Sequence, residues 1–223
     1  TVYESGWDVS SRFAHGKTTI IPVDLNCMLY YYEIDLLEWA KLNNDEESIK
    51  YWQNKLNQRS KAINKYLWNK KSGFFCDYDL KTKAHHTPKT LAGFFALWCG
   101  VATKAQAEAC RRQLKLFEHE YGLANSEAIP WHRRQWDYPN GWPPIQYIVI
   151  TGLRRYGFHD EANRLTKKWL DLNNDLLRET GKLWEKYDVV SGAIGRKGRY
   201  PTQPGFAWTN SVFLRLLQDM KKT

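Results

Sequence analysis

One short stretch of the sequence, ESGWDVSSRF at residues 4 to 13, sets an aromatic ring beside a carboxylate, at Trp7 and Asp8. Flat rings stack against the faces of pyranose sugars, and a carboxylic acid can protonate a glycosidic oxygen. The alternative is that Asp8 only caps a helix or a turn. With Ser5 and Gly6 in front of the pair, the stretch is typical of a sugar site, and these residues alone leave both interpretations of Asp8 open.

A second stretch, QWDYPNGWPP at residues 135 to 144, packs aromatic, polar and proline residues into ten positions. Prolines stiffen a loop, so its side chains can be held ready for a ligand at low ordering cost. The alternative is a rigid corner between helices whose tryptophans fill the core. The candidate ligand contacts in this loop are Gln135, Trp136, Asp137, Asn140 and Trp142.

The segments that must position these residues mostly repeat apolar residues at helical spacing, and few segments show the alternation of a strand. Thr103 is expected to cap one helix, and Gly100 to end the helix before it. Residues 69–79 predict a short turn or a two-stranded ribbon, and long loops span residues 119–142 and 185–205. The expected helices cover residues 25–42, 45–68, 87–99, 103–118, 144–156, 159–177 and 206–220. The pattern predicts an all-α fold of about seven helices in one domain, residues 1–223.

Composition narrows the function classes. The chain has 223 residues, is 43% hydrophobic and 15% aromatic, and carries a net charge of +9. Its basic pairs are scattered, so nucleic acid is not the expected partner. No apolar run reaches a membrane span and no targeting leader is visible, so we expect a soluble chain of undetermined compartment. No cofactor is expected, because the only metal-like pair, His85-His86, lacks a third ligand, and the four cysteines are expected to be free and buried.

The two motifs resemble those of the trehalases, glycoside hydrolase family thirty-seven. Further segments in the same order extend the resemblance over essentially the whole chain. These segments are PVDLN at 22–26, TPKTLAGFFALW at 87–98, EKYD at 185–188 and YPTQPGFAWTNSV at 200–212. The resemblance implies an (α/α)6 toroid that hydrolyses α,α-trehalose to glucose with inversion. Because family members are about twice as long, it also implies that this chain is the second half of the ring.

The resemblance also assigns roles. Asp8 is the implied general acid, and the substrate contacts include Gly6, Trp7, the candidates of the loop at 135–144, Phe206 and Trp208. The position that matches the family's catalytic base is Arg199, and a guanidinium cannot accept a proton from water. Glu185 and Asp188 on the same loop are alternative carboxylates.

Two hypotheses follow for function. The first is a trehalase-type glycosidase acting on trehalose or a related glucoside. The second is a catalytically inactive, trehalase-derived scaffold or sugar-binding subunit, associated with a partner chain that supplies the first half of the toroid. The scaffold hypothesis predicts an exposed apolar helix face, where the partner would dock.

Overall fold

Local capping signals explain where several helices begin in the computed structural model, which describes residues 5–13, 19–128, 134–196, 198 and 200–221. The Thr103 hydroxyl accepts the backbone N–H of Gln106, and the Gln106 side chain accepts the N–H of Thr103, which forms a capping box. Prolines occupy the first turn of the helix that follows Trp142. The α-helices are α1 Val23–Leu42, α2 Glu46–Ala62, α3 Phe95–Trp98, α4 Lys104–Arg112, α5 Pro143–Arg155, α6 His159–Thr180 and α7 Ala207–Met220.

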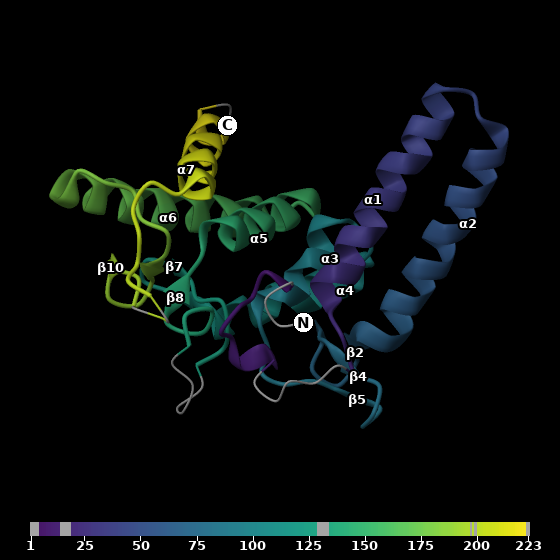
Figure 1. Ribbon diagram of the computed structural model, residues 1–223, viewed down its shortest axis with the longest axis horizontal. Helices are drawn as coiled ribbons and strands as arrows, with labels where there is room; N and C mark the ends of the chain where they lie inside the picture. The colour runs from purple at the N-terminus through teal and green to yellow at the C-terminus, as the bar shows by residue number, and fades with distance from the viewer. Residues whose placement is uncertain (1–4, 14–18, 129–133, 197, 199, 222–223) are drawn as a thin grey trace.

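The helices form two layers. The odd-numbered helices contact one another in sequence, α1 with α3, α3 with α5 and α5 with α7. On the other side, α2 packs on α1 as an antiparallel hairpin, and α6 packs on α5 and α7 (Figure 1). Paired inner and outer helices joined in this way are the arrangement of an α/α toroid, of which this chain is an arc. The predicted fold class is confirmed.

The predicted helices agree in number and order with the seven α-helices of the described residues. Two of them end earlier than expected, because π and 3-10 turns follow α2 and α4 at Ile63–Leu67 and Gln113–Leu116. One start is wrong, because the helix expected from residue 87 begins with a 3-10 turn at Leu91–Phe94. The residues before this turn pair with another segment instead: the N–H of Lys89 donates to the Glu127 carboxylate, and Thr90 forms a bridge with Ser126. A long-range pairing therefore delays the helix, which local sequence cannot reveal.

Short antiparallel strands pair within and between the long loops that connect the helices. They are β1 Ile20–Ile21, β2 Trp68–Asn69, β3 Phe74–Phe75, β4 Tyr78–Asp79, β5 Ala84–His85, β6 Glu118–His119, β7 Gly122–Leu123, β8 Asn140–Gly141, β9 Tyr187–Asp188 and β10 Ala193–Ile194. Antiparallel pairing of β2 with β3 makes residues 69–79 part of a ribbon, which was one of the two alternatives. The sheet β10-β9-β8 joins the two loops that carry the predicted site residues. Strands of two residues are too short to show an alternating pattern, so apart from this ribbon the sequence did not predict them.

The core lies between the helix layers and beneath these loops. Its largest fully buried apolar side chains include Trp142, Trp169, Phe74, Phe94 and Phe117. The four cysteines are free and buried, as expected. Much of the aromatic content is therefore core, and only part of it faces the loop side.

Candidate active site

Asp8 is held by the loop at residues 135–144, which carries five other predicted site residues. Its side chain is half-buried, and its two oxygens accept from different donors: Oδ2 from Gln135 Nε2 at 2.9 Å and Oδ1 from Trp136 Nε1 at 3.0 Å. Gly6, two residues earlier, is exposed with φ +75°, a left-handed conformation that suits glycine. Both donors to Asp8 are neutral, so its carboxylate is oriented without being paired to a cation by either of them.

The predicted aromatic residues form a continuous row. Trp136 stacks on Trp142 with centroids 3.9 Å apart and planes at 4°, and Trp7 lies 5.4 Å from Trp136 on the other side. Trp208 meets Trp142 edge-on at 5.6 Å and stacks on Phe206 at 4.9 Å. Trp7, Trp136 and Trp142 are buried, whereas Trp208 and Phe206 are half-buried. Three segments far apart in sequence therefore share one aromatic surface, and its Trp208 end remains accessible.

Asp137 holds the segment that follows Asp8. Its carboxylate accepts Ser10 Oγ at 2.9 Å and the Ser11 backbone N–H at 3.0 Å, at the start of the 3-10 turn Ser11–Phe13. Burial raises its pKa, and the hydrogen bonds from Ser11 and Ser10 oppose that rise only in part. The structure places Asp137 as a buried anchor that joins the loop to the Asp8 segment.

Asn140 and Trp142 brace the same loop internally. The Asn140 amide donates to the Gln135 carbonyl at 3.1 Å and accepts the Arg196 N–H at 2.9 Å. The Trp142 indole N–H donates to the same carbonyl of Gln135 at 2.8 Å. These contacts fix the backbone of Gln135, whose side chain holds Asp8.

A second carboxylate lies on the facing loop. Glu185 is buried, and it accepts Lys186 Nζ at 2.7 Å and the Tyr200 hydroxyl at 3.1 Å. Burial raises the pKa of Tyr200, and the negative charges of Glu185 and of Asp8 raise it further. The Tyr200 hydroxyl is thus bonded to Glu185 and lies within the electrostatic influence of Asp8.

Comparison with known proteins identifies the group to which this arrangement belongs. The trehalase family model matches residues 1–221. The chain belongs to the trehalase family. It is 39% identical over 224 residues to a periplasmic trehalase of Salmonella dublin, a match that covers 96% of this chain and 39% of that protein.

Solved structures agree. The neutral trehalase of Saccharomyces cerevisiae matches with a TM-score of 0.84 and 34% identity, over 98% of this chain and 41% of that one. A mannosylglycerate hydrolase of Thermus thermophilus matches with a TM-score of 0.71 and 27% identity, over 90% of this chain and 45% of that one. This chain therefore spans about two fifths of the length of the trehalases it matches.

Of two further residues named from the trehalase resemblance, Arg199 and Asp188, the structure describes only Asp188. Arg199 lies outside the described residues, so its assignment to the base position stays a prediction. Asp188, one of the alternative carboxylates, accepts the N–H groups of Val190 and Ser191 and pairs with Arg196 at 3.1 Å. It closes a turn of its own loop, which leaves Glu185 as the other candidate carboxylate.

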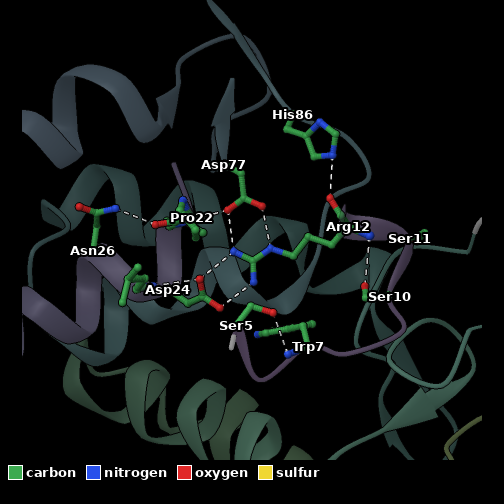
Figure 2. A network of polar contacts seen from close by, with 12 residues as sticks. Ser5, Trp7, Ser10, Ser11, Arg12, Pro22, Asp24, Asn26, Asp77 and His86 are labelled. Atoms are coloured by element: carbon green, nitrogen blue, oxygen red, sulfur yellow. Dashed lines mark hydrogen bonds and ion pairs between the residues drawn. The ribbon is translucent and has the colours of Figure 1, made fainter. Parts of the chain in front are cut away.

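Sequence reasoning missed the most strongly bonded charge near the site. Figure 2 shows the guanidinium of Arg12 between the carboxylates of Asp24 and Asp77, with four bonds of 2.6 to 2.7 Å. His86 Nε2 donates to the carbonyl of Arg12 at 2.8 Å, and both residues of the His85-His86 pair are half-buried rather than solvent-facing. The available signal was an arginine inside the motif of the predicted acid, together with an aspartate in PVDLN.

Two further observations concern membrane spans and metal sites. In the described part of the chain, no helix is long and apolar enough to cross a bilayer. Among the same residues, no cluster of three or more His, Cys, Asp or Glu side chains forms a cage for a metal ion.

Proposed function

We propose that this chain contributes the acid side of a trehalase-type active site, and that the protein hydrolyses α,α-trehalose to glucose with inversion. The observation that carries the proposal is the Asp8 carboxylate, half-buried and held through both oxygens by Gln135 and Trp136. An acid catalyst must be fixed in direction yet remain accessible to the substrate oxygen, and this arrangement meets both needs. The periplasmic and neutral trehalases among its relatives support trehalose as the substrate.

We propose Glu185 as the second carboxylate. An inverting glycosidase needs a base across the sugar ring, roughly 6.5–9.5 Å from the acid, to activate water. A carboxylate has about four acceptor sites, and Lys186 and Tyr200 engage Glu185 through one bond each. The sites that remain can accept the proton of a water molecule, a task that the guanidinium of Arg199 cannot perform.

In the proposed reaction Asp8 gives its proton to the glycosidic oxygen as the bond to the anomeric carbon breaks. Water attacks that carbon from the opposite face and loses its proton to Glu185. Trp208 and Phe206, at the accessible end of the aromatic row, are placed to stack on a glucose ring.

The test is glucose release from trehalose by the purified chain and by variants. Asp8→Asn and Glu185→Gln are each expected to lower the rate about 10²- to 10⁴-fold. Asp171→Asn on the exposed face of α6 is the matched control, because Asp171 is exposed and pairs with Lys167 across one helical turn. Activity that survives Asp8→Asn would overturn the assignment of the acid.

Arg199→Glu separates the two assignments of the base. If Glu185 is the base, adding a carboxylate at residue 199 leaves the rate of glucose release within about threefold of the original chain. If the site lacks only a base at residue 199, the same change produces a large gain. NMR observation of the fresh products reports inversion, because one of the two glucoses then forms as the β anomer.

One observation favours the second candidate function, a scaffold or sugar-binding subunit. One face of α1 carries exposed apolar residues at intervals of four and three positions, which places them along one stripe. These residues are Leu25, Leu29, Tyr32, Leu36 and Trp39. The opposite face of α1 is buried through Val23, Cys27 and Leu37, so the helix is apolar on two opposite faces, only one of which is covered in the part of the chain that the structure describes.

The proposed occupant of this stripe is a set of further toroid helices supplied by a partner chain. The trehalases that this chain matches are longer than the part it spans, and α7 also exposes Leu214, Leu217 and Met220. The scaffold hypothesis fails if the isolated chain is monomeric in sedimentation, stably folded and active. Calorimetric titration with trehalose then separates a sugar-binding subunit, which releases heat, from a scaffold, which does not.

A further inference from the structure

We propose that Arg12 is a positioning residue for the acid: it holds the Trp7 ring, and through the packing of Trp7 on Trp136 it sets the place of the Asp8 carboxylate. This inference rests on the proposed function for the role of Asp8, and on the geometry alone for the role of Arg12. Arg12 touches no reacting atom, so it acts through its neighbours.

The first step is the fixing of Arg12 itself. Its side chain is fully buried and forms a two-pronged pair with each of two carboxylates, Asp24 at the start of α1 and Asp77 beside β4. Burial alone would lower the pKa of Arg12, but the two carboxylates outweigh burial and raise it above its ordinary value. The guanidinium therefore stays charged, and it ties three segments to one point.

The second step runs from Arg12 to Asp8. The guanidinium carbon lies 5.0 Å from the centroid of the Trp7 ring and 4.8 Å from that of Phe13, within the range of cation–π attraction. Trp7 in turn packs against Trp136, whose indole N–H donates to Asp8. A displaced guanidinium would release the Trp7 ring and, with it, one of the two donors that orient Asp8.

The stability of the fold does not by itself explain why a charged residue is buried at position 12. Buried ion pairs often stabilise a protein no more than well-packed apolar residues of the same size would. What an arginine adds is a planar fork that binds two carboxylates in fixed directions, and a lysine cannot reproduce that geometry. A guanidinium fixed in this way can hold the Trp7 ring in one orientation beside the proposed acid.

The experiment compares Arg12→Lys with Arg59→Lys on two substrates. Arg59 is the matched control because it pairs with Glu33 and Asn26, between α1 and α2. On trehalose, Arg12→Lys is expected to lower kcat at least tenfold with KM within twofold. On α-D-glucosyl fluoride, whose fluoride leaves with little need of a proton, the loss is expected to stay within threefold. Equal losses on both substrates would show a merely structural role and overturn the proposal.

A second measurement does not depend on turnover. The hydrogen bond from Trp136 to Asp8 protects one indole N–H, which ¹H–¹⁵N spectra can follow and the Trp136→Phe variant assigns. We expect this N–H to exchange with solvent at least tenfold faster in Arg12→Lys and unchanged in Arg59→Lys. If the original chain hydrolyses neither substrate, the proposed function fails, and this exchange rate alone decides the role of Arg12: an unchanged rate overturns it. Should Arg12→Lys not fold, Asp24→Asn, which keeps the pair with Asp77, takes its place with the same expectation.

Discussion

Asp8 and Arg12 lie four positions apart on one segment, yet the fold treats their charges in opposite ways. Asp8 is half-buried, and its hydrogen-bond donors are the neutral groups of Gln135 and Trp136. Arg12 is fully buried, and two carboxylates surround it. Of these two charges, the one that joins segments is compensated completely, and the one proposed as the acid catalyst is left without a cation among these two donors.

The comparison is most strongly tested at Asp8. Asp8→Asn should lower glucose release about 10²- to 10⁴-fold while the free energy of unfolding changes by less than about 1 kcal/mol, because asparagine can still accept from the Trp136 indole. Steady-state kinetics and urea denaturation of the same preparation check both parts. A large loss of stability would show that Asp8 is a structural residue like Arg12.

The converse change is expected at Arg12. Arg12→Ala leaves Asp24 and Asp77 as buried charges without their partner, which should lower the free energy of unfolding by about 3–5 kcal/mol. Urea denaturation measures the loss. A loss of unfolding free energy below about 1 kcal/mol would mean that water reaches Asp24 and Asp77, and that Arg12 does not hold both carboxylates in solution.

Asp137 is a third charged group on this site, and its raised pKa makes the stability of the fold depend on pH. Because its folded pKa is raised, the folded protein binds its proton more tightly than the unfolded chain does. Its contribution to stability is present below the unfolded pKa of about 3.9 and is lost as the pH rises through the folded pKa.

Asp137→Asn keeps an oxygen for Ser10 and Ser11 and removes this titration. We expect the variant to lose less stability than the original chain between pH 4 and the raised pKa, by at most about 1.4 kcal/mol per pH unit. The midpoint of urea unfolding, measured against pH, gives the slope for each protein. Parallel slopes would assign the pH dependence to other groups.

The smallest effect is expected at an exposed ion pair. Lys167 and Asp171 form a contact of 2.6 Å on α6 with side chains that are 70% and 57% exposed. Lys167→Ala should change the free energy of unfolding by less than about 0.5 kcal/mol, since solvent and salt screen such pairs. A change as large as that of Arg12→Ala would contradict the view that burial decides what a charge contributes here.

Local signals made the helices and the motifs predictable. The capping box of Thr103 and Gln106, the prolines that open α5 and the left-handed Gly100 after α3 depend on residues close together in sequence. The late start of the helical turn before α3 was not predictable, because it depends on a bridge between Thr90 and Ser126. Arg12 was missed for the same reason, since Asp77, one of its two partners, lies 65 positions away.

The sequence by itself determined the trehalase family, the order of the helices and the set of aromatic and acidic residues available for a site. Only the tertiary structure decided how the carboxylates are used: Asp8 is left half-buried, Asp137 and Asp188 close buried contacts, and Glu185 is buried with Lys186 and Tyr200. The physical reason is that helix formation follows from neighbouring residues, whereas burial and the choice of hydrogen-bond partner depend on packing between distant segments.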